Sequence, residues 1–243
     1  MRAAAEEIGP SGLGERLRGL GFVRLRPAAM QQALAVPPAA LEEFAASWER
    51  LETDRFMADG GRYRRRRHAN FTQGEGPPRR GLHRPHFQAS VHNTLNGGVD
   101  RWFAPVEDAV GAGPVVAALL GFGATALPPG GRWFVEMHQF RIEAEAGLPG
   151  YPTPEGVHHD GVDFVLISMI RRTNLRGGET LVIDARGEEM ARFTLDGLLD
   201  TALLDDDRTM HGVTPIEPAE PRLPSRRDVL VITWKRQGAW LPG

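Results

Sequence analysis

The sequence predicts a mainly β fold, an antiparallel sandwich or barrel, with helices gathered in its N-terminal part. Three features point to this class. From residue 132 onward, short apolar segments rich in β-branched and aromatic residues alternate with clusters of Gly, Pro and Asp. No helical pattern separates these segments, which argues against a doubly wound parallel sheet. The residues before 132 instead carry apolar repeats that are typical of helices.

Length and composition are those of an ordinary globular domain. The chain has 243 residues, of which 41% are hydrophobic and 25% are charged, enough for one domain with a buried core. The formal net charge of −2 gives no general positive field for nucleic acid or for an anionic membrane. The absence of cysteine excludes disulfides, thiol nucleophiles and zinc–thiolate sites.

The sequence also carries a prediction about location. No segment has the run of about 20 apolar residues that a membrane helix needs. The N-terminus turns acidic at Glu6 and Glu7 before any apolar stretch, unlike a signal peptide. Because the lack of cysteine also fits a reducing compartment, we expect a cytoplasmic protein with no membrane partner.

The N-terminal elements follow from capping residues and apolar spacing. Ser11 is expected to cap a helix that runs to about Arg18 and ends at Gly19, and a short strand follows at residues 21–25. A second helix is expected to open at Pro37-Pro38. Its apolar residues recur at helical spacing: Leu41, Phe44, Ala45 and Trp48.

Residues 59–101 are rich in Gly, Pro, Arg and His and are expected to be irregular. Arginines cluster at position 62 and at positions 64–67. Our first interpretation is a solvated loop, the second is a gate that binds a substrate carboxylate, and the third is a nucleic-acid contact. A third helix is expected over residues 105–120, with Gly121 and Gly123 ending it.

The C-terminal half is read as strands because its apolar runs are short and bounded by turn residues. The expected strands are 133–142, 162–170, 179–183, 190–194, 201–204, 209–213 and 229–234.

Three residues in this half have the types and spacing of a metal site. Residues i and i+2 of a strand point to the same side, so His158 and Asp160 can face one ion. His211 lies in a later apolar strand, far enough along the chain to return to the same place. Two imidazoles and one carboxylate form the facial triad that holds Fe(II) and leaves positions open. The alternative is polar residues at strand ends that bond to backbone.

A basic turn then runs into an apolar strand and supplies a candidate anion anchor. Strand alternation puts Arg227 on one face with Val229, Val231 and Thr233. A guanidinium binds both oxygens of a carboxylate at once, so we expect Arg227 to hold the distal carboxylate of a cosubstrate. Arg226 and Arg222 are the alternatives, and a surface arginine at a strand entrance is the other interpretation.

Two further groups of polar residues have weaker patterns. Gln139 and Arg141 share one face of the expected strand at 133–142, so Gln139 is predicted to line the cavity and hold cosubstrate or substrate. A solvated polar face would give the same alternation. His83 and His86 flank Pro85 in a loop. Because the triad is already complete, we expect them to be exposed or hydrogen-bonded rather than metal ligands.

Several blocks of residues, from about position 20 to the end, carry a resemblance. They are 62–65 (RYRR), 83–88 (HRPHFQ), 93–101 (NTLNGGVDR), 138–141 (HQFR), 154–161 (PEGVHHDG), 177–180 (GGET), 211–215 (HGVTP) and 227–231 (RDVLV). In this order they resemble the Fe(II)/2-oxoglutarate-dependent dioxygenases of the bacterial L-isoleucine 4-hydroxylase type. The basic segment 63–67 departs from that family.

The resemblance implies a double-stranded β-helix, a cupin-like jelly roll, with iron ligation by His158, Asp160 and His211. It also implies 2-oxoglutarate and O₂ as cosubstrates. We therefore expect a single oxygenase domain over residues 1–243, with 1–131 as helical support and loops and 132–243 as the jelly-roll core. The expected activity is hydroxylation of a small molecule, a free L-amino acid or related carboxylate. The alternatives are the same iron chemistry on a nucleic-acid base or protein side chain, and a non-catalytic cupin-like ligand-binding protein.

Overall fold

The computed structural model describes residues 12–57, 60–88 and 98–238. Among them, antiparallel strands form an eight-stranded main sheet in the order β1-β10-β6-β13-β5-β3-β2, with β4 paired to β3. Its strands are β1 (Phe22–Leu25), β2 (Glu52–Thr53), β3 (Arg64–Gln73), β4 (Arg79–Arg80), β5 (Trp133–Ala144), β6 (Phe164–Thr173), β10 (Thr201–Asp205) and β13 (Ser225–Arg236).

A second layer of strands faces the main sheet. Its three-stranded part has the order β11-β8-β9, and a two-stranded part pairs β12 with β7. The strands are β7 (Leu175–Gly177), β8 (Glu179–Asp184), β9 (Glu189–Thr194), β11 (Thr209–Val213) and β12 (Ile216–Pro218). Apolar side chains of β8 and β9 pack against β6, β10 and β13 to form the core between the layers. The predicted mainly β jelly roll with N-terminal helices is confirmed.

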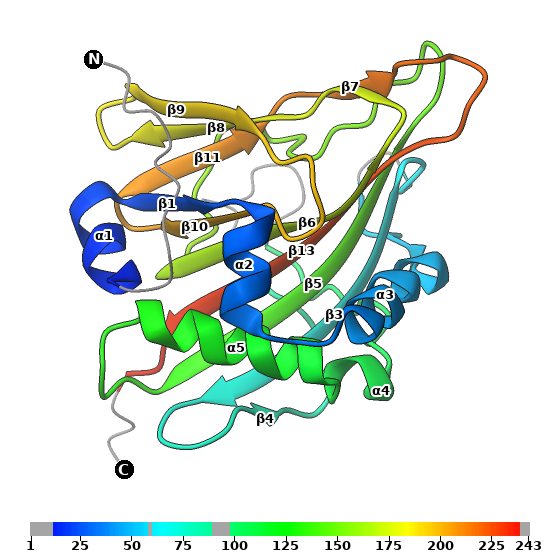
Figure 1. Ribbon diagram of the computed structural model, residues 1–243. Coiled ribbons are helices and arrows are strands. Elements are labelled where there is room, and N and C mark those ends of the chain that lie inside the picture. Colours follow the sequence, from blue (N-terminus) through cyan, green and yellow to red (C-terminus); the bar gives the residue numbers. More distant parts are fainter. Residues whose placement is uncertain (1–11, 58–59, 89–97, 239–243) are drawn as a thin grey trace.

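Helices cover the opposite face of the main sheet (Figure 1). They are α1 (Leu13–Leu20), α2 (Pro27–Leu34), α3 (Pro38–Ala46), the 3₁₀ turn η1 (Ser47–Arg50), α4 (Asp108–Gly111) and α5 (Pro114–Ala126). The larger hydrophobic core lies between these helices and the sheet. None of the helices among the described residues is long and apolar enough to span a membrane.

The predicted helix ends need correction. Helix α1 ends at Gly21, whose φ of 79° suits a left-handed cap, rather than at Gly19, and the expected cap Ser11 lies outside the described residues. Helix α2 was not predicted. Helix α5 continues through Gly121 and Gly123 to Ala126. A Cβ at position 123 would lie 2.3 Å from the Trp234 ring. The close contact with that ring requires the glycine, and packing outweighs its low helix propensity.

The largest correction concerns the arginine cluster, which belongs to strand β3 rather than to a solvated loop. Strand β3 pairs with β5 from Arg64 to Gln73. Arg64 and Arg66 are buried, whereas Arg65 and Arg67 on the other face form ion pairs with glutamates. The segment before residue 132 therefore contributes a long strand of the main sheet as well as helices and loops. The alternation of buried and paired arginines, rather than apolar residues, concealed the strand.

Candidate active site

A cavity of about 330 Å³ lies between the main sheet and the second layer. Alternate residues of the long strands line it. On β5 these are the even-numbered residues Phe134 to Ile142, and on β13 they are the odd-numbered residues Arg227 to Lys235. The opposite parity on both strands faces the helices. The expected shared face of Arg227, Val229, Val231 and Thr233 is therefore the cavity face.

The three predicted metal ligands meet at this cavity. His158 lies in a loop, and reciprocal backbone hydrogen bonds of 3.0 Å pair it with His211 of β11. The His158 Nε2 atom is 3.5 Å from Asp160 Oδ1, and His211 Nε2 is 3.7 Å from Asp160 Oδ2. One ligand atom from each residue lies within 4.8 Å of the others. The tertiary structure thus brings together all three.

The local geometry fits a bound cation. Separations of 3.5 and 3.7 Å exceed the usual hydrogen-bond length and leave room for an ion that touches all three groups. The Nδ1–H of His158 donates to the Gly156 carbonyl at 3.1 Å, which leaves Nε2, 3.5 Å from both Asp160 Oδ1 and Glu155 Oε1, as the atom that faces an ion. His211 Nδ1 is buried and has no partner among the described residues.

The electrostatics of the triad favour positive charge at His158 but not at His211. Burial opposes the charge of His158, but the Asp160 and Glu155 carboxylates outweigh it and raise the pKa of His158 to about 9. Although burial alone would raise it, the neighbouring imidazoles lower the pKa of Asp160 well below its usual range. Burial lowers the pKa of His211 to about 4. A dication would replace the His158 proton as the partner of Asp160.

A buried carboxylate, which the sequence did not reveal, fixes the loop that carries Asp160. Asp206 Oδ1 accepts the backbone N–H of Asp160 at 3.0 Å, and Oδ2 accepts those of Gly161 and Val162 at 2.8 and 3.2 Å. Its side chain is 2% exposed. The only sequence signal was an acidic run at 205–207, which resembles an ordinary surface turn.

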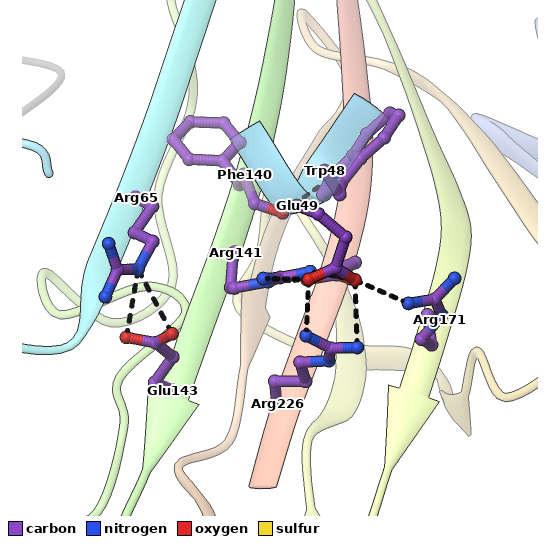
Figure 2. Close-up of polar contacts among 9 residues, drawn as sticks. Trp48, Glu49, Arg65, Phe140, Arg141, Glu143, Arg171 and Arg226 are labelled. Carbon is purple, nitrogen blue, oxygen red and sulfur yellow. Dashed lines mark hydrogen bonds and ion pairs between the residues drawn. The ribbon is translucent and has the colours of Figure 1, made fainter. Parts of the chain in front are cut away.

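Arg227 is a buried cation that faces the cavity and has no anionic partner among the residues that the structure describes. It is 2% exposed, and its Nε and Nη2 atoms have no hydrogen-bond partner among the described residues. Burial and the nearby Arg172 lower its pKa to about 10. Its two alternatives lie elsewhere: Arg226 contacts Glu49 on the helix-covered face, and Arg222 is exposed (Figure 2).

Gln139 lies on the wrong side of the sheet for the predicted pocket role. Its Nε2 donates to Ser47 Oγ at 2.8 Å, beneath η1, and it does not line the cavity. Its neighbour in parity, Arg141, binds Asp228 and Glu49 on that same face (Figure 2). The prediction that the two residues share a face is confirmed. The pocket role assigned to Gln139 is wrong, because β5 turns its odd-numbered residues to the helices.

A second cluster of histidines and a carboxylate lies on the cavity, at β3 and β5. His68 Nε2 and His86 Nδ1 each lie 2.9 Å from Glu136 Oε1, and His138 stacks on His68 with ring centroids 4.7 Å apart. His86 was expected to be exposed or hydrogen-bonded, and it is hydrogen-bonded. The other three were not singled out, because they lie in two separate strands.

Comparisons with known proteins find a matching family model and similar proteins. A family model described as 2OG-Fe dioxygenase matches residues 45–233. The 3(1)-hydroxy-L-isoleucine 4-dioxygenase of Pantoea ananatis is 26% identical over 204 residues, 81% of each chain. A crystal structure of a bsmA homolog from Methylobium petroleophilum PM1 is 40% identical, with a TM-score of 0.85 over 98% of this chain and 97% of that chain. The fold is also similar to that of IDO from Bacillus thuringiensis, at 17% identity and a TM-score of 0.78 over 95% of this chain and 100% of that chain.

Proposed function

This chain belongs to the 2OG-Fe dioxygenase family, and from that premise we propose that it hydroxylates a free L-amino acid or a related small carboxylate. The family uses Fe(II), 2-oxoglutarate and O₂, so the protein is a 2-oxoglutarate-dependent oxidoreductase. The relative from Pantoea ananatis is named for a reaction on a hydroxylated L-isoleucine. That name supports an amino acid as the substrate of the present chain.

The iron ligands in this proposal are His158, Asp160 and His211. The observation that carries the proposal is their arrangement: three donors of the facial-triad type, spaced beyond hydrogen-bond length around one point on a cavity wall. Fe(II) held there, together with 2-oxoglutarate and O₂, would supply the oxidising chemistry for a C–H bond. Asp206 would keep the ligand loop in place by accepting its backbone N–H groups.

Arg227 would anchor 2-oxoglutarate by its distal carboxylate. The side chain is buried on the cavity face of β13, and two of its nitrogens lack partners among the described residues. An unpaired buried guanidinium is costly, and a bidentate carboxylate would relieve that cost. The apolar residues beside it on the cavity face, Val229 and Val231, would exclude water from the methylene chain.

The remaining alternatives receive less support. In the arginine cluster, Arg64 and Arg66 are buried and Arg65 and Arg67 are paired with acids, so these four form no free basic surface for nucleic acid. A non-catalytic ligand-binding protein would not need three ligand side chains arranged around an open position.

The first test is conversion of 2-oxoglutarate to succinate by purified protein with Fe(II) and ascorbate. Turnover that depends on Fe(II) is expected, and its absence would contradict the proposed function. A mass-spectrometric screen of aliphatic L-amino acids for a product heavier by one oxygen then tests the substrate class. Oxidation of a nucleic acid or a protein side chain, without any amino-acid product, would exclude a free amino acid as the substrate.

A further inference from the structure

The cavity has a second charged end, formed by residues that the proposed iron and 2-oxoglutarate sites do not use. Arg64, Arg66 and Arg101 lie near Asp54 and Glu136. The charges of the other four groups shift the pKa of Arg66. Glu155 is a third carboxylate whose charge acts on Arg101. The three arginines, Asp54 and Glu136 are buried, so each of their polar atoms needs a partner.

Arg66 is enclosed by two aromatic rings. Its guanidinium lies 3.8 Å from the centroid of the Phe103 ring and 4.4 Å from that of Phe140. Nη2 donates to His138 Nδ1 at 2.9 Å, the Asp54 carboxylate is 3.9 Å from Nη1, and Nε has no partner among the described residues. The rings hold the guanidinium in place, and burial lowers its pKa to about 9.

Arg101 stands beside the proposed iron ligands. Its Nη2 donates to Gln88 Oε1 at 3.3 Å, and Gln88 Nε2 donates to the Asp160 carbonyl at 3.3 Å. Nε of Arg101 is buried and lacks a partner within the described part of the chain. The Nε atom of Arg64 is likewise buried without a partner among the described residues, but its Nη2 is bonded to the backbone carbonyls of residues 151 and 152. Arg66 and Arg101 are therefore the cations best placed to accept an added anion.

Glu136 provides the opposite charge at the same end. It lines the cavity, and its Oε1 accepts hydrogen bonds from His68 and His86, both at 2.9 Å. These bonds orient the carboxylate and lower its pKa below the usual range, against the effect of burial. The cluster therefore keeps a fixed negative charge close to two cations. That pair of charges matches a zwitterion.

The same cluster could be considered as a second metal site, since its four ligand atoms lie within 4.8 Å of one another. Its geometry argues against this. At 2.9 Å the imidazole N–H groups of His68 and His86 are already used on Glu136 Oε1. Arg66 also occupies His138 Nδ1 as a hydrogen-bond donor. The cluster is closed by hydrogen bonds, unlike the triad.

We infer that this end of the cavity binds the head group of an α-amino acid substrate, with Arg66 and Arg101 holding its carboxylate and Glu136 its ammonium group. The inference rests on the proposed function and extends it to named residues. The side chain of the substrate would then extend along the apolar cavity wall toward His158, Asp160 and His211. His68 and His86 act as positioning residues for Glu136.

The test is calorimetric binding of L-isoleucine, L-leucine and L-valine to protein loaded with Fe(II) and 2-oxoglutarate in the absence of O₂. Arg66→Gln and Arg101→Gln should each raise the amino-acid Kd at least about 30-fold, because a buried charge pair loses one partner. Arg66→Lys should raise it less. The matched control is Arg65→Gln, on the same strand but the opposite face, where Kd should stay within about twofold. The Kd for 2-oxoglutarate should change by less than about threefold in every variant.

A second measurement uses the wild-type protein and does not depend on how variants fold. The decarboxylated amine and the 2-hydroxy acid that match each amino acid should both bind at least about tenfold more weakly. Glu136→Gln should abolish the preference for the amino acid over the 2-hydroxy acid, and it should keep the preference over the amine. Equal binding of the three compounds would overturn the inference, as would a variant at Arg66 or Arg101 that weakens 2-oxoglutarate instead. Wild-type protein that makes no succinate would overturn the proposed function itself, whereas succinate production without these head-group effects would overturn the inference alone.

Discussion

Two clusters, each made of histidines and a carboxylate, lie on one cavity. The distances from the histidine nitrogens to the carboxylate oxygens differ between the clusters and indicate different roles. In the triad, His158 and His211 stand 3.5 and 3.7 Å from the oxygens of Asp160. In the second cluster, His68 and His86 stand 2.9 Å from Glu136. The first set leaves a place for an ion, whereas the second is already satisfied by its own protons. Residue types alone do not distinguish a metal site from a hydrogen-bonded anchor.

The largest effect should come from removing the carboxylate of the triad. Asp160→Ala should lower 2-oxoglutarate turnover by at least about 100-fold, because an iron ligand has a stronger effect than its supporting residues. Turnover, iron content and thermal unfolding of the purified variant would measure this. The matched change in the second cluster, Glu136→Gln, should keep its iron. If Glu136→Gln lost its iron and Asp160→Ala kept it, the metal site would belong to the second cluster rather than to the triad.

The proposed anion anchor, Arg227, should give the next effect. Arg227→Met should raise the KM for 2-oxoglutarate about 30-fold or more, because the buried partner of a carboxylate is lost. Without cosubstrate the same variant should unfold at a higher temperature, because an unpaired buried charge is removed. Arg226→Met, one residue away on the other face, serves as the control for the KM. An unchanged KM in the Arg227 variant would leave the cosubstrate anchor to another residue.

The loop that carries Asp160 provides a third test. Asp206→Ala should weaken iron binding about 10- to 100-fold and cost about 2–3 kcal/mol of unfolding free energy, because three backbone N–H groups lose their acceptor. Iron titration and chemical denaturation would report the two effects. Asp207, its exposed neighbour, gives the control Asp207→Ala. Equal iron affinity in the two variants would show that the triad does not depend on Asp206.

The smallest effect lies on the opposite face of the same strands, where Glu49 binds Arg141, Arg171 and Arg226 (Figure 2). Hydrogen bonds from Arg141 and Arg226 lower the pKa of Glu49 to about 2 despite some burial. A depressed carboxylate pKa stabilises the fold above the unfolded value of about 4.5, and this stability is lost as pH falls toward 2.

Glu49→Gln should therefore cost about 1 kcal/mol at pH 7, since the side chain is partly exposed and screened by solvent. The difference from wild type should shrink as pH falls below about 4.5 and vanish near pH 2. Denaturation curves at a series of pH values would test this, with iron binding as the internal control. If the difference in unfolding free energy between wild type and Glu49→Gln grew as the pH fell, the ion pairs of Glu49 would destabilise the fold.

Residue types and a family resemblance pointed to His158, Asp160 and His211, which the structure brings together. The sequence by itself determined the fold class and the pairs of residues that share a strand face. These features depend on local rules: short apolar runs, and a side-chain period of two. The same rules found that Arg227 accompanies Val229 and Val231, and that Gln139 accompanies Arg141. Alternation shows which residues share a face of a strand, but not which face lines the cavity. The shared face of Gln139 and Arg141 was therefore predicted correctly, whereas the pocket role of Gln139 was wrong.

Only the tertiary structure decided which parity faces the cavity, because helices cover one side of the main sheet and the second layer covers the other. It also decided that arginines in β3 form a buried strand, since their partners, Asp54, Phe103 and Phe140, come from distant segments. The second cluster exists only where β3, β5 and the segment around His86 meet. Contacts between segments far apart in the chain have no local pattern, and their energies depend on burial that the folded chain alone creates.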